Sequence, residues 1–526
     1  MKDMTEPSSR PSETIPGERG ASRGDARLAG ALATAVVLAA LWAVSGWVTA
    51  VEFLPTQVAT KIIRSVPGDL ATFFIESVGH LARPLLVAGV LAGALLLGAE
   101  TLARTARGGR LRPFLAGAAL AVIGWLALLP TSSGGLATQS ALLSTLALIV
   151  AALLYARIAE AVAAGRSTSH THDPGRRRTL GLGASTALAL VLAGGVAGYF
   201  ARKLGGPNRA IALVEPVEPA LLPERPGFPQ IPGLTPEITP VGKHYVVDIN
   251  LVQPSVEAEG WNLELTGEVE SPLALSFSEL GQGFEVVEEY SVLTCISNEV
   301  GGDLVGSSLW GGVRLKDLLD AAGPLPGAFD VVFRAADGYS DSITLETARS
   351  PSVLLAFAQN RRPLTQEHGF PCRVRVPSTY GMKNVKWIES IEVVARDYKG
   401  YWMERGWSDL ALVRTQSRID VAGDSGAAVA GDATWIAGVA WAGDRGVDKV
   451  EVSTDGGRTW HDAQLKEPIS PLTWRQWAYR WTPEEPGTTS VVCRATDGLG
   501  EVQTKDLAAP HPAGATGYHL REVTVA

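Results

Sequence analysis

The chain has 526 residues, of which 46% are hydrophobic, 57 are glycine and only three are cysteine. It is too long for one hydrophobic core, so we expect two or three domains. Residues 1–203 hold 19 Lys and Arg against 11 Asp and Glu, whereas the whole chain has a net charge of −8, so residues 204–526 carry about −16. An acidic C-terminal part excludes nucleic-acid binding, and three cysteines exclude a disulfide framework and a zinc site.

Long apolar runs in the first part of the chain predict membrane spans, each able to cross a bilayer core of ~30 Å. The second is the shortest and crosses only if Thr101–Ala103 complete it, and a turn of small residues divides the third run into two spans. The predicted five-helix transmembrane region comprises Leu28 to Val51, Pro84 to about Ala103, two spans within Pro113 to Ala156, and Thr179 to Ala201.

Arginines crowd the loops after the second and fourth spans, and the third loop carries no charge. By the positive-inside rule the N-terminus is cytoplasmic, and five spans place everything after Ala201 outside the cytoplasm. Arg176-Arg177-Arg178 precedes the last span and resembles a twin-arginine export signal, the alternative being ordinary stop-transfer arginines. His80 is the one histidine before His170, so we expect no membrane haem, whereas quinone binding stays open.

Nine prolines between Pro207 and Pro240 predict an extended spacer between the membrane and the next domain. Alternation of apolar and polar residues then predicts strands at His244–Asn250 and Trp261–Val269, and short helices are expected at Leu315–Ala322 and Ser350–Gln359. The mixture indicates an α+β domain over about residues 243–410.

After about residue 415 the pattern changes to short strands separated by turns, which is typical of an antiparallel β-sandwich. The expected strands are Thr434–Trp441, Val447–Ser453, Ala478–Trp481, Ser490–Ala495 and His519–Val525. A single copy of Ser-x-Asp-Gly-Gly-Arg-Thr-Trp, at 453–460, matches the Asp-box of sialidase propellers, but one copy is interpreted as a stabilised turn.

Three ordered motifs carry the chemical signal. They are Leu-Thr-Cys-Ile-Ser-Asn at 293–298, His-Gly-Phe-Pro-Cys-Arg at 368–373, and Tyr-Gly-Met-Lys-Asn-Val-Lys-Trp at 380–387. In this order and over roughly residues 243–526 they resemble the sulfite oxidase family of molybdopterin enzymes. The resemblance implies that Cys295 binds molybdenum, because a soft thiolate suits a redox metal that also holds a dithiolene. Cys372 and Cys493 are interpreted as buried small hydrophobes.

The resemblance also implies which residues hold the pterin and its anionic phosphate, which favours cationic and N–H donors. Taken alone, each such lysine could be a solvated charge and His368 a buried core histidine. The predicted cofactor-binding residues are His368, Arg373, Lys383, Asn384, Val385, Lys386, Asn298, Asp337, Asp248 and Asn250. One molybdopterin per chain is expected and no haem.

The chain departs from the family where a substrate anion would bind. Val300 replaces the arginine five residues after the cysteine, Val247 lies near the position of the first-strand arginine, and Phe357 replaces an active-site tyrosine. Binding of doubly charged sulfite needs fixed cations. The Tyr-Gly-Met-Lys segment is instead closer to periplasmic methionine-sulfoxide reductases, which act on neutral oxides.

The sequence therefore predicts a membrane-anchored extracytoplasmic molybdopterin oxidoreductase that transfers an oxygen atom on a small or protein-borne S- or N-oxide. Sulfite oxidation is the alternative, and a non-catalytic surface protein with an adhesive sandwich is the alternative of another class. Expected partners are a separate electron-transfer protein or a quinone, the membrane, and a second copy of the chain. The predicted segments are a tail (1–27), the transmembrane region (28–203), a linker (204–242), the molybdopterin domain (243–412) and an immunoglobulin-like dimerisation domain (413–526).

Overall fold

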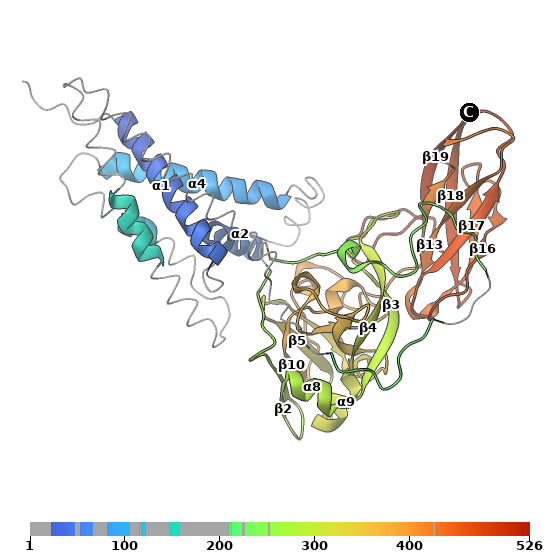
Figure 1. The fold of residues 1–526 in the computed structure, drawn as a ribbon, viewed down its shortest axis with the longest axis horizontal. Coiled ribbons are helices and arrows are strands. Elements are labelled where there is room, and N and C mark those ends of the chain that lie inside the picture. Colours follow the sequence, from blue (N-terminus) through green and yellow to red (C-terminus); the bar gives the residue numbers. More distant parts are fainter. Residues whose placement is uncertain are drawn as a thin grey trace, which may run out of the picture. The chain divides into compact units, whose positions relative to one another are not determined.

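The computed structural model describes residues 23–47, 53–66, 82–105, 115, 117–122, 147–157, 211, 213–222, 227–250, 253–423 and 427–526. The chain divides into two compact units, Met1–Ser65 with Val78–Gly205 and Val66–Ser77 with Gly206–Ala526. The first unit is helical and the second is built mainly of β-strands, and each is described by itself (Figure 1).

The described part of the first unit contains α1 (Arg23–Trp47), α2 (Leu54–Ser65) and α4 (Ala82–Thr105). Two helices are long and apolar enough to cross a membrane, over Ala26–Ser45 and Pro84–Arg104, and a shorter apolar helix covers Ala147–Arg157. The prediction of five spans is therefore not supported: two candidates are found among the described residues, and residues 123–146 of the run predicted to hold two spans, together with the span predicted at Thr179 to Ala201, lie outside them. Arg176–Arg178 and His80 also lie outside the described residues.

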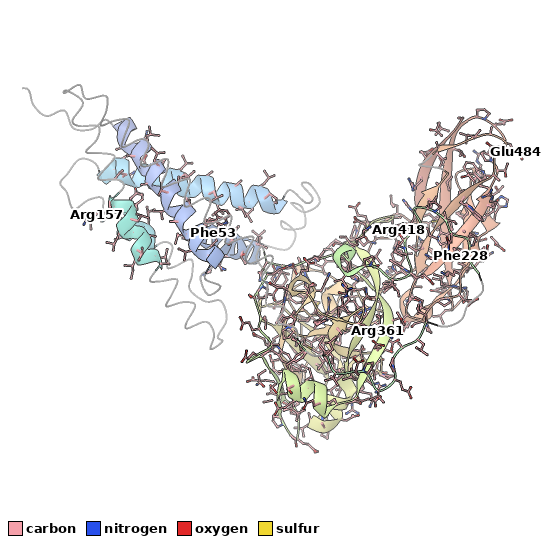
Figure 2. The ribbon with its side chains drawn as sticks, in the orientation of Figure 1. Phe53, Arg157, Phe228, Arg361, Arg418 and Glu484 are labelled. Atoms are coloured by element: carbon pink, nitrogen blue, oxygen red, sulfur yellow. The ribbon has the colours of Figure 1, made fainter. Side chains whose placement is uncertain are left out.

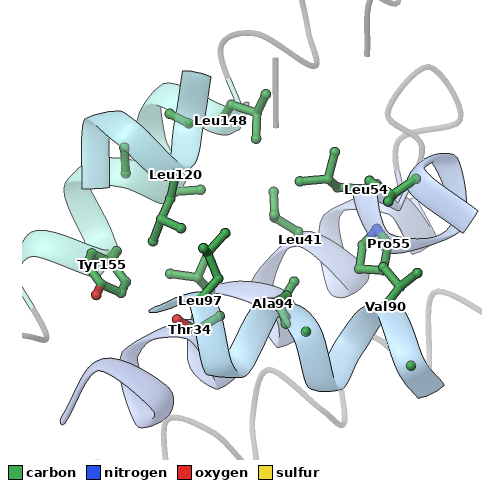
Figure 3. A pocket seen from close by; sticks show the side chains of 18 of the residues that line it. Thr34, Leu41, Leu54, Pro55, Val90, Ala94, Leu97, Leu120, Leu148 and Tyr155 are labelled. Atoms are coloured by element: carbon green, nitrogen blue, oxygen red, sulfur yellow. The ribbon is translucent and has the colours of Figure 1, made fainter. Parts of the chain in front are cut away.

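Small residues bring α1 and α4 together. A Cβ added at Gly30 of α1 would lie 2.4 Å from the carbonyl oxygen of Gly98 in α4, so the backbones meet where neither residue has a side chain. The hydroxyl of Tyr155 donates to the same carbonyl at 2.9 Å. Beside this contact an apolar cavity of about 560 Å³ is lined by α1, α2 and α4 and by residues 117–121 and 148–155 (Figure 3).

One mixed sheet and one antiparallel sheet form the first half of the second unit. One has the order β2 (Leu273–Ser276), β1 (Asn262–Gly267), β10 (Ile388–Val394), β5 (Asp330–Ala335) and β6 (Ser340–Thr344). The other joins β3 (Val286–Thr294), β4 (Val305–Arg314), β7 (Leu354–Gln359) and β8 (Arg362–Pro363), with β9 (Arg373–Arg375) paired to β7. Short helices α8 (Phe277–Gly283), α9 (Leu315–Ala322) and α10 (Leu345–Ala348) complete the α+β arrangement.

The main core of this half is formed by side chains of both sheets and α9. Leu263 and Phe333 come from the first sheet, Val313 and Leu355 from the second, and all are fully buried. Helix α9 buries Leu315, Leu318, Leu319 and Ala322, which is the spacing of one helical face. Burial of this continuous apolar interior fixes the register of the strands whose ends carry the site.

Two further sheets form a sandwich after residue 415. One has the order β11 (Gln416–Ala422), β13 (Thr434–Trp441), β17 (Arg475–Trp481) and β16 (Gln464–Leu465), and the other β12 (Ala427–Ala428), β19 (His519–Val525), β18 (Gly487–Asp497), β14 (Val447–Ser453) and β15 (His461–Asp462). One core takes Ile436 and Trp477 from the first sheet and Val450 and Val523 from the second. The sheets therefore pack face to face, and the immunoglobulin-like assignment stays a prediction.

Several strand predictions are confirmed and two element predictions are wrong. Strands β13, β14 and β19 have the predicted bounds, and α9 matches its predicted helix. His244–Asn250 contains no strand, and Ser350–Gln359 is not a helix but contains β7. All six residues of β7 are buried, and a short apolar run in a sheet centre cannot be told from a buried helix by periodicity.

The proline-rich stretch runs against the second unit where it is described, instead of standing free as a spacer. Arg361 donates to the carbonyl of Ala220 at 2.7 Å and to Glu288 at 2.9 Å (Figure 2). Phe228 and Ile231 pack against a small core of the sandwich, and Trp474 donates to the carbonyl of Glu237 at 3.0 Å. Extended proline-rich backbone is thus tied to both halves by side chains.

Candidate molybdopterin site

The loop that follows β3 carries Cys295. The Cys295 side chain is 7% exposed, and its Sγ lies 2.9 Å from the hydroxyl of Ser297. The side-chain oxygen of Asn298 accepts a hydrogen bond from the backbone N–H of Leu304 at 2.8 Å. This hydrogen bond closes the loop. Burial raises the pKa of the Cys295 thiol, and metal coordination would be required to hold it as thiolate at neutral pH.

The loop of the third motif approaches the cysteine closely. A Cβ added at Gly381 would lie 3.8 Å from the Cα of Cys295 and 2.6 Å from the Tyr245 hydroxyl. Only glycine therefore lets these three segments meet. The buried Tyr245 phenol has its pKa raised well above the usual range by burial and by the nearby Cys295 thiol.

Two guanidinium groups lie side by side behind this contact. Arg373 and Arg375 alternate along β9, so both point to one face, and their guanidiniums lie 5.2 and 5.6 Å from the ring of Trp310. Arg373 donates to the carbonyls of His368 and Asn384, each at 3.0 Å, and Arg375 donates to the Asn384 side chain at 2.6 Å. Burial lowers the pKa of Arg373 to about 10 and of Arg375 to about 9, which leaves both charged at neutral pH.

Two histidines form the next wall of this cluster. The rings of His244 and His368 meet edge to face with centroids 5.5 Å apart, and His368 Nε2 lies 3.1 Å from the carbonyl of Val241. Burial, together with the neighbouring arginine, lowers the pKa of His368 to about 4 and that of His244 to about 3. Both rings are therefore neutral at pH 7 and can offer one donor and one acceptor each.

The described residues leave three ring or guanidine nitrogens of this cluster buried and without a hydrogen-bond partner. They are His244 Nε2, Arg373 Nε and Arg375 Nε. Within the described part of the chain, neither arginine donates to a carboxylate; their acceptors are carbonyls, the Asn384 amide and the Ser291 hydroxyl. Two buried cations with orphaned donors fit an anionic group such as the pterin phosphate. We name Arg373, Arg375, His244, His368 and Trp310 the cradle.

Most of the other predicted residues surround the cradle. Lys386 is paired with Asp248, donates to the carbonyl of Glu367 at 3.0 Å, and covers the ring of Trp387 at 4.5 Å. Asn250 donates to the carbonyl of Asp337 at 2.9 Å. The Val385 side chain is buried in the main core, so only its backbone is free to face a ligand.

Lys383 does not face the cradle. Its ammonium lies 2.9 Å from Asp341 Oδ1, 2.8 Å from the carbonyl of Ser342 and 3.5 Å from Asp409. We therefore leave Lys383 out of the residues that would hold the cofactor. Asn384 is placed between the arginines by its own contacts, with its carbonyl oxygen bound to Arg373 and its side-chain oxygen to Arg375.

The sequence prediction missed four residues of the site, Arg375, His244, Tyr245 and Trp310. The alternation Arg373-Val374-Arg375 could have revealed the first, since residues two apart on a strand share a face. His244 and Tyr245 gave no such signal, because they were taken for a strand that the structure does not contain.

Phe357, which replaces the tyrosine expected from the family, lies away from this cluster. Its ring meets Phe277 with centroids 5.7 Å apart in the main core, whereas Leu354 and Ala356 of the same strand pack with Trp310. Val247 is exposed and Val300 is half-buried in the loop after Cys295. No cation therefore occupies these two positions.

Comparison with known proteins agrees with this geometry. Residues 250–402 match the family described as "Oxidoreductase molybdopterin binding domain", and residues 412–509 match "Mo-co oxidoreductase dimerisation domain". The fold and site thus define a molybdopterin-binding oxidoreductase, and this result excludes the alternative of a non-catalytic surface protein.

Curated relatives extend the match across both domains. Sulfite oxidase of Arabidopsis thaliana is 27% identical over 331 residues, covering 51% of this chain and 83% of that protein. Mitochondrial sulfite oxidase of Mus musculus is 34% identical over 39% of this chain, and nitrate reductase [NADH] 1 of Oryza sativa subsp. japonica is 28% identical over 51%. The chain spans 43% of the mouse protein and 36% of the rice protein. The chain belongs to the sulfite oxidase-like family of molybdenum-dependent oxidoreductases.

Proposed function

We propose that this chain is a membrane-anchored oxidoreductase that takes the oxygen atom from a neutral S- or N-oxide, with its catalytic part outside the cytoplasm. Cys295 would ligate molybdenum, and the cradle with Lys386 would hold the pterin and its phosphate. When bound, the cofactor supplies two-electron oxygen-atom transfer, and the protein supplies position and electrostatics.

The observation that supports a neutral substrate is the charge of the cysteine loop. Val300 and Val247 are neutral where the family resemblance expects arginines, and the nearby cations Arg373 and Arg375 are buried among carbonyls and orphaned in a way that suits the cofactor's anion. The site then has no fixed cation left to bind a dianionic substrate such as sulfite, whereas an S-oxide needs only hydrogen-bond donors.

Three phenols are close enough to the cysteine to be affected by its charge. The pKa of Tyr245, Tyr339 and Tyr380 is raised chiefly by burial, with the Cys295 thiol as a further cause in each case. All three therefore stay protonated at neutral pH. A protonated phenol can donate a hydrogen bond to the oxygen of a neutral oxide, and the Tyr245 hydroxyl lies beside the cysteine loop.

Sulfite oxidation is the second candidate, favoured by the sulfite oxidases among the curated relatives. Arg375 would have to serve the substrate instead of the cofactor for this reading to hold. The two candidates differ in how activity depends on substrate charge, and this difference is measurable.

The membrane assignment rests on α1 and α4, which are long and apolar enough to span, and on the arginines of the loops. A lone helix near the N-terminus also has the features of a signal sequence, so two spans are the minimum for an anchor of this type. Protease protection of tagged full-length protein in sealed vesicles would show on which side residues 243–526 lie.

The function is tested on the full chain in detergent, with turnover normalised to bound molybdenum. Dimethyl sulfoxide, methionine sulfoxide and trimethylamine N-oxide are supplied with a reduced viologen, and sulfite is supplied with an oxidised dye. We expect oxide reduction to exceed sulfite oxidation per molybdenum by at least about 100-fold, the size of effect given by one lost charge-stabilising contact. Faster sulfite turnover would overturn the neutral-oxide proposal and support sulfite oxidation.

A further inference from the structure

A row of ionisable side chains leads from the neighbourhood of Cys295 to the protein surface. The Tyr339 hydroxyl donates to Asp341 Oδ2 at 2.7 Å, and Asp341 Oδ1 lies 2.9 Å from Lys383 Nζ. Lys383 Nζ is in turn 3.5 Å from Asp409 Oδ1. We name Tyr339, Asp341, Lys383 and Asp409 the relay. It shares no residue with the cradle.

The inner end of the relay lies next to the cysteine loop. The Tyr339 hydroxyl oxygen also lies 2.8 Å from the carbonyl oxygen of Met382, so its single proton has two alternative acceptors, and Met382 follows Gly381, which lies close to Cys295. The backbone N–H of Tyr339 is held by the Asp337 carboxylate at 2.9 Å. The phenol of Tyr339 is therefore fixed within electrostatic range of the metal-binding thiol.

The outer end reaches solvent through Asp409, whose side chain is 42% exposed, whereas Lys383 is 3% and Asp341 0% exposed. Lys399 lies 2.5 Å from Asp409 and 2.7 Å from Asp397, which is 54% exposed. Asp397 and Asp409 thus share a lysine, but of these two carboxylates Asp409 is the one that is paired with Lys383. Asp409 is the entrance.

The middle pair of the relay is enclosed by protein, and its further partners include the backbone N–H of Ser342, which donates to Asp341 at 2.8 Å. Met403 Sδ lies 3.7 Å from Lys383 Nζ, and the carbonyl of Ser342 accepts at 2.8 Å. The charged groups around this region also include Asp330, Asp337 and Arg334. Asp330 accepts a hydrogen bond from the Ser342 hydroxyl, and Arg334 is paired with Glu392. Burying an ion pair stabilises a fold little or not at all, so the pair needs a reason beyond stability.

Oxygen-atom transfer needs protons as well as electrons at this site. Reduction of a sulfoxide consumes two electrons and two protons, breaks the S–O bond and releases sulfide and water. The electrons come through the metal from a one-electron redox partner, and the protons must come from the medium. A buried site with an oriented chain of donors can receive them without bulk water.

We propose that the relay carries these protons from solvent to the molybdenum site. The Tyr339 hydroxyl proton moves to the departing oxygen as the phenol oxygen takes a proton from Asp341, which has received it from the Lys383 ammonium; the neutral Lys383 amine is then reprotonated by a proton bound at Asp409. Each transfer breaks one N–H or O–H bond and forms another, so every relay residue ends as it began. The inference rests on the proposed oxide reduction.

Asp409→Asn and Asp397→Asn form a matched pair of variants for its test. Both remove one exposed carboxylate from Lys399, and only the first removes the entrance. Full-length, molybdenum-loaded enzyme is reduced and mixed with methionine sulfoxide in weak buffer, and proton uptake is followed by a pH-indicator dye in a single turnover. We expect uptake to slow about tenfold or more in Asp409→Asn, the size expected for loss of a positioned proton donor, and to stay within about twofold of wild type in Asp397→Asn.

Small acids provide a readout that a purely structural role would not move. Acetic acid or imidazolium at millimolar concentration should restore uptake in Asp409→Asn and in Asp341→Asn. The second variant keeps the size of the side chain but replaces one accepting oxygen with an NH2 donor and removes the carboxylate from Lys383, so its melting temperature and molybdenum content are measured to report folding and loading separately. Equal uptake in both members of the matched pair, or slow uptake without rescue, would overturn the relay. Oxide turnover that is absent in wild type would instead contradict the proposed function, and the relay with it.

Discussion

The two basic regions beside Cys295 are built on opposite principles. In the cradle, Arg373 and Arg375 are buried with carbonyl and amide partners and keep orphaned nitrogens. In the relay, Lys383 is equally buried but is paired with Asp341, and further contacts lead to the surface. A buried cation without a carboxylate gains a counter-ion only when an anionic ligand binds, whereas a paired cation already has one. The third motif thus divides its lysines, with Lys386 beside the cradle and Lys383 in the relay.

The largest effect on turnover should come from substitution of Cys295, the residue that both the cradle and the relay are proposed to serve. Cys295→Ala removes the predicted metal-binding thiolate of the loop after β3, and we expect turnover per chain to fall by at least about 1000-fold, as when a nucleophile or metal ligand is lost. Cys372→Ala is the matched control, since Cys372 is also free and fully buried but lies in the main core. Comparable turnover in the two variants would contradict the assignment of Cys295.

The second prediction compares the two kinds of cation in cofactor-free protein. Lys383→Met strands the Asp341 carboxylate and should cost about 3–5 kcal/mol of stability, the usual penalty for breaking a buried pair. Arg373→Met strands no carboxylate and should leave stability unchanged or increased. Unfolding by guanidinium, followed by tryptophan fluorescence of protein made without molybdopterin, measures both. A larger loss in Arg373→Met than in Lys383→Met would break the comparison.

The third prediction concerns pH and the histidines of the cradle. Their pKa values are lowered to about 3 for His244 and about 4 for His368, from an ordinary value near 6.5. The folded state therefore prefers neutral rings, so their contribution is full above the unfolded pKa and is lost as pH falls from about 6.5 toward 4. We expect each of the two histidines to lower the free energy of unfolding by about 1.4 kcal/mol per pH unit within that range.

The check is the free energy of unfolding of cofactor-free protein at pH 7 and pH 5, in wild type and in His368→Gln. The variant should lose less stability on acidification. His519 in the sandwich also has its pKa lowered, to about 4, and His519→Gln provides the same kind of change outside the cradle. A slope unchanged in His368→Gln would contradict the neutral, buried state of this ring.

The smallest effect should come from a position outside both regions. Phe357→Tyr restores the hydroxyl that the family resemblance places here, but the ring lies against Phe277 in the main core. We expect a loss of stability of about 1–3 kcal/mol for a buried hydroxyl without a partner, and no change in KM for sulfite or for oxides. A marked fall in the KM for sulfite would show that this ring faces the substrate.

The sequence predicted the family, because ordered motifs can be recognised without knowledge of packing, and the same motifs predict that Cys295 binds the metal. It predicted β13, β14, β19 and α9 to the residue, since each has a strong period and clear turn residues at its ends. It failed at β7, where burial on both faces removes the period, and at His244–Asn250, where alternation arises without a strand.

The division between cradle and relay could not be predicted from the sequence. Lys383 and Lys386 are three residues apart in one loop and look alike in a motif, but the backbone of η4 (Gly381–Lys383) turns their side chains in different directions. The partner that decides the role of Lys383 is Asp341, 42 residues away on β6. Only the pairing of β5 with β6 brings that carboxylate to the loop.

The most direct test of the account is the number of sulfur ligands on molybdenum, measured by X-ray absorption at the metal edge in wild type and in Cys295→Ser. The account predicts one sulfur fewer in the variant, with pterin content retained because the cradle is intact, and no change in Cys372→Ser. An unchanged sulfur number in Cys295→Ser would contradict the placement of the metal at this cysteine, and with it the roles given to the cradle and the relay.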